Sequence, residues 1–209
     1  DEVLGLKKVA SSDVSQVIPK RTWTTGTTYD MYEHNISASN TSASGATNLY
    51  DATFYVINSS NAVYKCIEND GATASTSEPT STSTSIFSTA DGYRWKYMYS
   101  LSTTQVTNFV STDFMPVSTN STVSSAAVDG ALDTVLIAAG GSSYDVSGGA
   151  TSGTITAVPI RGDGSGGVAS VTLSSGTVSA VTITTAGTGY TFAYIRNADL
   201  IAATNAGGN

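Results

Sequence analysis

The sequence predicts an all-β protein: a β-sandwich-like domain followed by a small duplicated Gly/Thr-rich β-module, with one or two short helices. Three observations carry this prediction. Nearly a third of the chain is serine or threonine and only 12% is charged, a composition typical of short strands joined by polar turns. Strong helix formers are scarce, whereas Val, Ile, Thr and Tyr recur with a period of two. The last third of the chain also contains a duplication.

The clearest strand lies within DGYRWKYMYSL, residues 91–101. Side chains alternate along a pleated strand, which predicts one face with Tyr93, Trp95, Tyr97 and Tyr99 and another with Arg94, Lys96 and Met98. A buried aromatic side chain removes roughly 150–250 Å² of surface from water. We therefore expect the aromatic face to form the core of the sandwich or, as the alternative, a subunit interface. The cationic face is expected to look outward or toward a partner.

Before residue 53 the sequence predicts short elements and one loop. Residues 11–16 fit a short helical turn with a Ser or Asp cap, which Pro19 ends. The following segment, WTTGTTYDMY, predicts two short strands around Gly26. Residues 35–47 show no periodicity and predict a loop.

The clearest hairpin spans residues 53–67. Its strands are TFYVI and AVYKCI, and they flank a turn at Asn58–Asn61, so we expect antiparallel pairing. Cys66, the only cysteine, is expected in the core as a small hydrophobic residue. The Ser/Thr-rich segment 68–90 then predicts a long crossing to the aromatic strand. Loops of this length in a compact domain are often functional, mobile or held by a partner.

A short helix is expected after the aromatic strand, because Ser102 and Gln105 have the spacing of a capping box. Beyond it the chain becomes rich in serine and threonine, and residues 118–127 resemble a linker. The sequence therefore predicts a first domain over residues 1–117, a linker over 118–127 and a second module after it.

The second module, residues 128–209, contains an internal repeat. The two copies lie 46 residues apart, at 130–144 and 176–190. Each begins with glycine, continues with an apolar alternation that predicts a strand, and ends in Gly-x-x-Tyr, with the tyrosine expected to pack over its turn. A fixed period of this size indicates a duplicated supersecondary unit. Two more strands are predicted between the copies, at 154–160 and 168–173.

The charge of the chain argues against nucleic acid as a partner. The net charge is −7 and the isoelectric point is near 4.4. The largest basic clusters are the pairs Lys7-Lys8 and Lys20-Arg21, so the basic surface that phosphates require is missing. No apolar run approaches the roughly 18 residues of a membrane helix, and no secretory signal opens the chain. No membrane partner is expected.

No motif predicts catalysis, a metal or a cofactor. His34 is the only histidine and no G-x-S-x-G elbow accompanies it, so a Ser-His-Asp hydrolase is not expected. One cysteine and one histidine cannot build a zinc site or an internal disulfide. The scattered carboxylates leave a glycosidase-like pair open but give no positive indication of one. Arg161-Gly162-Asp163 spells the integrin tripeptide and 162–167 faintly resembles a calcium β-roll repeat, but a turn is the preferred interpretation of both.

Five short blocks occur in a suggestive order. They are D-x-V-L-G at 1–5, V-I-P-K-R-x-W at 17–23, V-Y-K-C at 63–66, E-P at 78–79 and D-G-Y-x-W-x-Y at 91–97. Together they resemble the baseplate wedge protein of T4-like contractile-tailed phages, the gene-eight product family. The resemblance covers about the first 117 residues. After Val117 the Gly/Thr-rich module departs from the family pattern, which leaves the role of residues 128–209 open.

The resemblance implies a structural virion component without catalysis, a baseplate wedge subunit that is assembled in the host bacterial cytoplasm. Its implied partners are other wedge subunits and a second copy in a homodimer. The candidate interface residues are Lys20, Arg21, Trp23, Arg94 and Lys96. The candidate core residues are Tyr93, Trp95, Tyr97, Tyr99 and Cys66. The alternative for Lys20 and Arg21 is that both cations only solvate a turn.

Two other functions stay open, namely a tail-fibre or receptor-binding adhesin that recognises a host-surface glycan, and a glycan-active enzyme. An adhesin should expose aromatic side chains beside Asp, Asn or Gln at loop tips. A wedge subunit should bury the face with Tyr93 and present a large mixed patch to its neighbours. The chain opens on Asp1 without a methionine, so we also expect it to be a fragment of a longer polypeptide.

Overall fold

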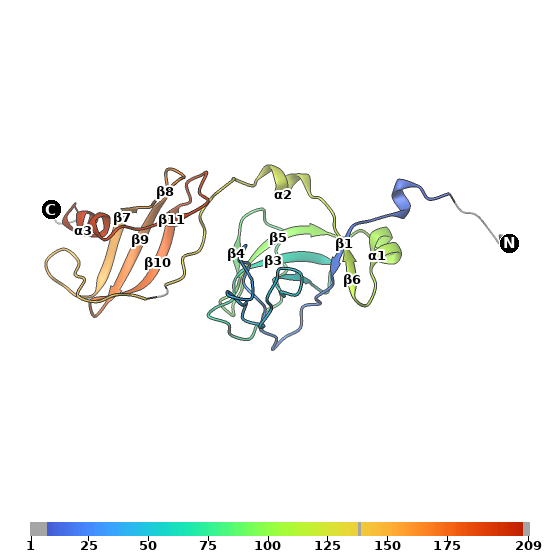
Figure 1. The fold of residues 1–209 in the computed structure, drawn as a ribbon, viewed down its shortest axis with the longest axis horizontal. Helices are drawn as coiled ribbons and strands as arrows, with labels where there is room; N and C mark the ends of the chain where they lie inside the picture. Colours follow the sequence, from blue (N-terminus) through green and yellow to red (C-terminus); the bar gives the residue numbers. More distant parts are fainter. Residues whose placement is uncertain (1–7, 138, 207–209) are drawn as a thin grey trace. The chain divides into compact units, whose positions relative to one another are not determined.

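A computed structural model describes residues 8–137 and 139–206 (Figure 1). The chain divides into two compact units, Asp1–Ala127 and Val128–Asn209. The described part of both units consists of antiparallel strands with a few short helices, so the all-β prediction is confirmed. The D-x-V-L-G block at 1–5 lies outside the described residues.

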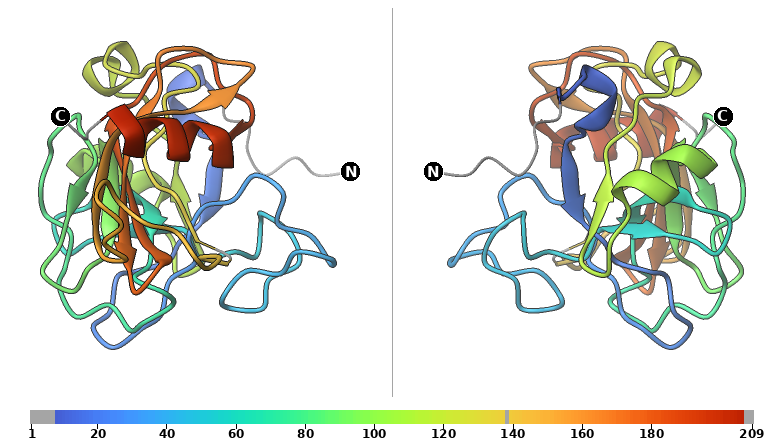
Figure 2. Two further views of the ribbon diagram at one scale, coloured as in Figure 1. Left: turned by 90° about the vertical axis from the view of Figure 1, so that its left-hand side faces the viewer. Right: turned by 90° about the vertical axis from the view of Figure 1, so that its right-hand side faces the viewer.

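The first unit contains one four-stranded sheet and one two-stranded ribbon. Strands β2, β3, β5 and β4 lie in that order in the antiparallel sheet. β1 pairs with β6 in the ribbon, seen in the right-hand view of Figure 2 as a blue strand beside a yellow-green one. The predicted hairpin is confirmed as β2 and β3. In chain order the elements are a 3-10 turn at Ser11–Asp13, β1 Val17–Pro19, β2 Tyr55–Ile57, β3 Ala62–Glu68, β4 Phe87–Ser88, β5 Arg94–Ser100, α1 Thr103–Phe109, β6 Phe114–Pro116 and α2 Ser121–Ser125.

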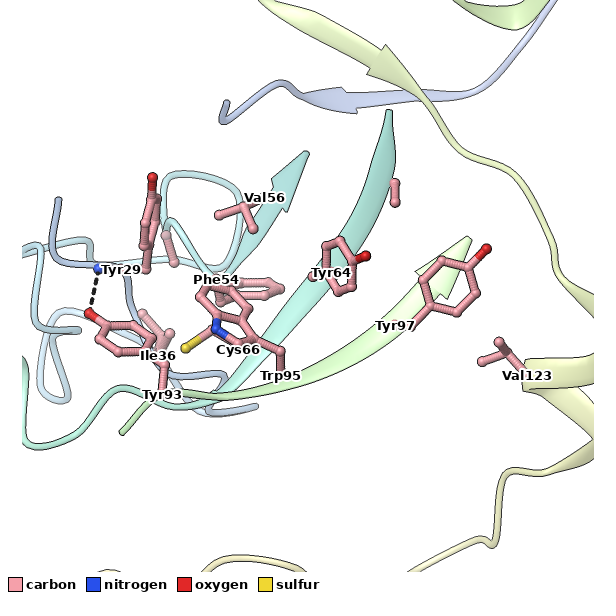
Figure 3. Close-up of a cluster of buried hydrophobic side chains, with 12 residues drawn as sticks. Tyr29, Ile36, Phe54, Val56, Tyr64, Cys66, Tyr93, Trp95, Tyr97 and Val123 are labelled. Atoms are coloured by element: carbon pink, nitrogen blue, oxygen red, sulfur yellow. Dashed lines mark hydrogen bonds between the residues drawn. The ribbon is translucent and has the colours of Figure 1, made fainter. Parts of the chain in front are cut away.

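One face of the four-stranded sheet carries an aromatic core (Figure 3). Tyr93, Trp95, Tyr97 and Cys66 are buried in it, as the sequence predicts. The cluster members that lie outside the sheet come from irregular chain and from α2, namely Tyr29, Ile36, Ala52, Phe54 and Val123. Loops and one helix, rather than a second sheet, therefore supply the side chains that cover this face.

Tyr99 does not share that face. Along the β3–β5 pair, Tyr64 lies opposite Tyr97 and Val63 lies opposite Tyr99, so Met98 is an extra residue on β5, a β-bulge. Val63 and Tyr64 are consecutive and point to opposite faces, and so do their partners. Tyr99 is buried in a second cluster with residues of β1 and β6. The prediction of one face for all four aromatics is therefore wrong after Tyr97, although all four are buried.

The chain before β2 is more irregular than predicted. Thr22 and Thr27 form only isolated bridges, to Ile57 and Ser75, and the two strands expected around Gly26 do not form. Gly26 has a φ of +81°, a left-handed conformation that interrupts an extended strand. The prediction of strands here is therefore wrong.

A buried carboxylate holds part of this irregular chain in place. Asp30 accepts hydrogen bonds from the amide and the hydroxyl of Ser44, both at 2.7 Å, and from the amide of Thr53, also at 2.7 Å. Burial raises the pKa of Asp30, but these hydrogen bonds outweigh it and the pKa is lowered overall. Asp30 thus joins the loop at 35–47 to the chain that enters β2.

Both helices of the first unit begin at a side-chain cap. In α1 the predicted capping box is confirmed: Ser102 Oγ accepts from the Gln105 amide at 3.2 Å, and Gln105 Oε1 accepts from the Ser102 amide at 2.9 Å. Residues 118–127, predicted as a linker, contain α2 and belong to the first unit. Asn120 caps α2, and Val123 buries its side chain in the aromatic core.

The second unit contains a three-stranded antiparallel sheet in the order β10-β9-β7 and a short β8–β11 pair. The strands predicted between the repeat copies are confirmed as β7 and β9, and the C-terminal helix α3, which the sequence did not predict, packs Leu200 into the core of this sheet. The elements are β7 Gly153–Pro159, β8 Arg161–Gly162, β9 Val168–Ser174, β10 Thr177–Thr185, β11 Ala193–Tyr194 and α3 Asn197–Ala206.

Only the second copy of the repeat forms a strand, β10, among the described residues of the two copies. The first copy runs antiparallel along the edge of β10. Leu132 donates its amide to Ala186 O at 3.0 Å, and Val178 donates its amide to Gly140 O at 2.9 Å. These bonds are too widely spaced for a continuous ladder, so the prediction of a strand in the first copy is wrong. Both bonds nevertheless join equivalent positions of the repeat, 132 with 186 and 178 with 140.

Candidate interaction surface

The outward face of the β1–β6 ribbon is apolar. Val17 lies opposite Pro116 and Pro19 lies opposite Phe114, so these four side chains share one side of the ribbon, although Pro116 itself is fully buried. The intervening Met115 points to the other side and is fully buried in the second cluster. Val17 is 46% exposed and Phe114 is 39% exposed. The ribbon therefore presents apolar residues where an alternating strand usually presents polar ones.

Two further exposed apolar side chains flank the ribbon strands in the sequence. Val117 directly follows β6, is 38% exposed and donates its amide to Gln16 O at 2.8 Å, which extends the pairing of the ribbon. Val14, before β1, is 64% exposed. We call Val14, Val17, Phe114 and Val117 the ribbon patch. Grouped exposed apolar side chains of this kind mark interaction sites more often than single ones do.

The ribbon also has open edges. Within residues 8–137 and 139–206, neither β1 nor β6 pairs with a third strand. An open edge offers backbone N–H and C=O groups to a strand of another chain. On β6 the amide and the carbonyl of Phe114 bond to Ser111, and Pro116 O accepts from the Tyr99 hydroxyl. β1 is therefore the edge of the ribbon that suits pairing with another chain.

Lys20 and Arg21 directly follow β1 in the sequence, and we call these two residues the cationic rim. The backbone fixes them, because the amide of Lys20 donates to Asp113 O and the carbonyl of Arg21 accepts from the amide of Ile57, both at 2.8 Å. Their side chains are half-buried and make no ion pair or hydrogen bond with any other described residue. Both positive charges thus remain available to a partner.

Trp23, the third predicted interface residue, is committed within the first unit. Its Nε1 donates to Ser75 Oγ at 3.0 Å, and Ser75 Oγ donates to Asp91 Oδ2 at 2.9 Å. The indole is half-buried and packs against the aromatic core. Trp23 therefore joins the start of the chain to the loop at 68–90 and is better described as a peripheral core residue than as a surface contact.

The cationic face of β5 is covered rather than free. Lys96 donates its ammonium to the carbonyl of Thr84, and Arg94 lies 3.9 Å from the Glu68 carboxylate. Both cations are half-buried. The expectation that Arg94 and Lys96 look outward is wrong, because the loop at 68–90 folds back over this face and supplies the carbonyl that Lys96 binds.

A further lysine, Lys65, lies on this face directly opposite Lys96. Two like charges at opposed positions destabilise a sheet unless each finds a partner. The partner of Lys65 is an aromatic ring, since its Nζ lies 3.2 Å from the ring centroid of Tyr32. Burial lowers the pKa of Lys65 to about 8, and the electron-rich face of the ring opposes part of that effect.

The integrin-like tripeptide in the second unit has both of its charged side chains engaged internally. Arg161 forms a bidentate pair with Asp199 of α3, at 2.8 and 3.0 Å, and Arg196, which directly precedes α3, binds the same carboxylate. Asp163 accepts hydrogen bonds from the amide and the hydroxyl of Thr191. These bonds, and the hydroxyl bond most of all, lower the pKa of Asp163 to about 2. The tripeptide is thus part of the fold, but Arg161 and Gly162 form strand β8, paired with β11, rather than the turn that the sequence predicts.

Other chemistry is sparse over the described ranges. They contain no group of three or more His, Cys, Asp and Glu side chains placed to hold a metal ion. Burial raises the pKa of the Cys66 thiol, which disfavours a reactive thiolate. None of the helices in the described part is long and apolar enough to cross a membrane. No protein-family model, curated protein or solved structure matches the chain.

The sequence indicates the two cations of the rim as interface residues, but it does not indicate the apolar residues of the ribbon patch. Both ribbon strands are three-residue runs that contain proline, VIP and FMP. Proline within an apolar run is typical of an edge strand, so the composition carried a usable signal. The pairing joins residues almost a hundred positions apart, and nothing in the local sequence specifies it.

Proposed function

We propose that the protein is a structural virion component, a baseplate wedge subunit of a contractile-tailed bacteriophage that holds wedge proteins together, and that the ribbon patch is its contact surface. The observation that carries this proposal is the apolar outward face of Val17 and Phe114 beside the unpaired cations of Lys20 and Arg21. Stable protein interfaces combine a desolvated apolar centre with a polar rim in this way.

The family resemblance supports the same surface. The block V-I-P-K-R-x-W at 17–23 includes all of β1 and both rim cations. A short apolar strand followed by two cations suits a contact made by strand addition and steered by charge. The aromatic side chains of β5 are buried within the first unit. The proposed interface of this unit is therefore the ribbon and not the face with Tyr93.

The proposed partners are other wedge subunits and a second copy of this chain. A net charge of −7 gives each copy a predominantly acidic surface, which complements the rim of Lys20 and Arg21 on its neighbour. Complementary charge at a rim raises the rate of association more than the final affinity.

Sedimentation equilibrium and wedge reconstitution test the proposal. The protein is expected to dimerise and to join wedge subunits from the same phage. The pair Val17→Thr with Phe114→Ser should weaken both associations at least tenfold. Leu49→Ser is the matched control, because Leu49 is also 39% exposed in the first unit but is not a residue of the ribbon. It should leave association unchanged.

The charged rim is tested by Lys20→Glu with Arg21→Glu. This double variant should slow assembly and make its rate less dependent on salt, with the thermal unfolding of the chain unchanged. A protein that stays strictly monomeric and joins no wedge subunit would contradict the proposed function. If such a monomer also retained a glycan on an array, the adhesin would replace the wedge subunit as the better assignment.

A further inference from the structure

The second unit contains a pocket of about 310 Å³ between the loop at 142–145 and one side of α3. Its wall combines the apolar side chain of Leu200 and the ring of Tyr144 with the polar side chains of Ser142, Asp145 and Asn197. This volume is near the lower end of the range of natural ligand pockets, about 300–1,000 Å³. It therefore suits a small ligand.

The repeat shows that this pocket is a departure from the duplicated pattern. In both copies the tyrosine ring lies over the glycine three positions earlier. A Cβ added to Gly141 would lie 2.8 Å from Tyr144 Cε2, and one added to Gly187 would lie 2.7 Å from Tyr190 Cε2. The expectation that each tyrosine packs over its turn is confirmed, so Tyr144 and Tyr190 occupy equivalent positions.

The two tyrosines nevertheless have different surroundings. Tyr190 is 7% exposed, and its hydroxyl donates to Ile160 O at 3.2 Å and accepts from the Gly167 amide at 3.1 Å. Tyr144 is only half-buried, and its hydroxyl has no hydrogen-bond partner in the part of the chain that the structure describes. The fold thus encloses the side chain of Tyr190, whereas it leaves the equivalent side chain of Tyr144 partly exposed.

Three polar groups of the pocket are also unengaged, whereas the Thr204 hydroxyl donates to Leu200 O at 3.0 Å. The Asp145 carboxylate, the Asn197 amide and the Ser142 hydroxyl make no side-chain hydrogen bond to any described residue. A carboxylate accepts two O–H groups, and an amide both donates and accepts. Adjacent hydroxyls on a sugar ring satisfy such a set, and the aromatic ring of Tyr144, which lines the pocket, is suited to contact the C–H groups of the sugar.

Charge limits the class of ligand. Asp145 is the only charged side chain of the pocket wall over the described residues, so an anionic ligand would be repelled. We propose that this pocket binds one neutral pyranose unit of a glycan, stacked on Tyr144 and hydrogen-bonded by Asp145 and Asn197. The inference does not depend on the proposed wedge function, because the ribbon patch belongs to the first unit.

Titration of the full chain with glucose, galactose, mannose and N-acetylglucosamine tests this proposal, with resonances of α3 and of the loop at 142–145 followed by NMR. At least one sugar should saturate the protein with a millimolar or tighter dissociation constant. Tyr144→Ala and Asp145→Asn should each weaken binding at least tenfold. Tyr144→Phe, which keeps the ring, should weaken it less than threefold.

Asp129→Asn is the matched control, because Asp129 is exposed in the same unit and does not line the pocket. It should leave binding unchanged, and all variants should unfold within a few degrees of the parent. The proposal is overturned if none of the four sugars saturates the protein, or if the bound sugar is insensitive to both Tyr144→Ala and Asp145→Asn. A pocket that takes an acidic peptide instead of a sugar would also overturn it.

Discussion

The ring of Tyr93 stacks on the indole of Trp95, with centroids 5.5 Å apart and planes 17° from parallel, while the Tyr93 hydroxyl donates to Thr73 O at 2.5 Å. The same hydroxyl accepts from the buried amide of Tyr29 at 3.2 Å. Tyr29 in turn packs edge-on against Trp95, 5.9 Å between centroids. One tyrosine thus joins the strand, the irregular chain before β2 and the loop at 68–90.

Trp95→Ala should therefore destabilise the first unit by about 3–5 kcal/mol, the usual cost of truncating a large buried aromatic. Trp95 is fully buried and contacts rings on two sides. Trp23→Ala, which removes the same side chain at a half-buried position, should cost less. Urea titration measures both losses. A loss below about 1 kcal/mol for Trp95→Ala would show that Trp95 is not a core residue.

The sequence predicted the hairpin and the burial of the aromatic strand because both depend on local pattern. Alternation over residues 91–97 decides which side chains face inward. The bulge at Met98 was not predictable, since it arises from the register between β3 and β5 and not from β5 alone. Tyr99 consequently changes face without any change in the sequence pattern.

The same limit applies to the candidate surface. Arg94 and Lys96 look exposed in the sequence because their strand alternates, yet the distant Glu68 and the carbonyl of Thr84 engage them. α2 and α3 also escaped prediction. Their sequences are rich in serine, threonine, asparagine and alanine without a clear apolar stripe. A single buried apolar residue in each, Val123 or Leu200, therefore anchors the helix through tertiary contacts.

Two buried tyrosine hydroxyls with different partners give a matched pair of tests. Tyr93→Phe removes a hydroxyl with two hydrogen bonds and leaves the Tyr29 amide without a partner, so it should cost about 1–3 kcal/mol. Tyr64→Phe removes a buried hydroxyl that has no partner among the described residues, so its effect should be within about 0.5 kcal/mol or slightly stabilising. Chemical denaturation of the two variants measures both, and equal losses would contradict the assigned hydrogen bonds.

Asp91 should contribute to stability in a defined range of pH. Burial raises the pKa of Asp91, but hydrogen bonds from Thr89, Ser77, Ser75 and Thr76 outweigh it and lower the pKa to about 2 from an ordinary value of 3.8. Because the folded pKa is the lower one, the contribution is complete above about pH 4 and is lost as the pH falls toward 2. It amounts to roughly 2 kcal/mol at most.

The variant Asp91→Asn tests this contribution. It should be less stable than the parent at neutral pH, and the difference should shrink as the pH falls from about 4 to about 2, where the parent loses its ionised carboxylate. Urea midpoints measured at several pH values give the comparison. Parallel acid unfolding curves for the two proteins would assign the acid sensitivity to other groups.

The two copies of the repeat are joined by backbone hydrogen bonds at equivalent positions. Tyr144 donates its amide to Gly176 O at 3.0 Å, and the equivalent Tyr190 donates its amide to Gly130 O at 3.2 Å. Both glycines have positive φ, +75° at Gly176 and +63° at Gly130, so alanine at either position costs about 1–2 kcal/mol. The space around them differs, because a Cβ would lie 2.2 Å from Tyr190 N at Gly130 but 3.3 Å from Tyr144 O at Gly176.

Gly130→Ala must therefore displace backbone as well as adopt a strained conformation, whereas Gly176→Ala needs only a shift of a few tenths of an ångström. We expect Gly176→Ala to lose about 1–2 kcal/mol and Gly130→Ala to lose clearly more, about 3–5 kcal/mol. Thermal unfolding of the second unit compares the two. If both variants lose the same stability, the closer approach at Gly130 has no energetic role, and the two halves of the repeat interact through their side chains instead.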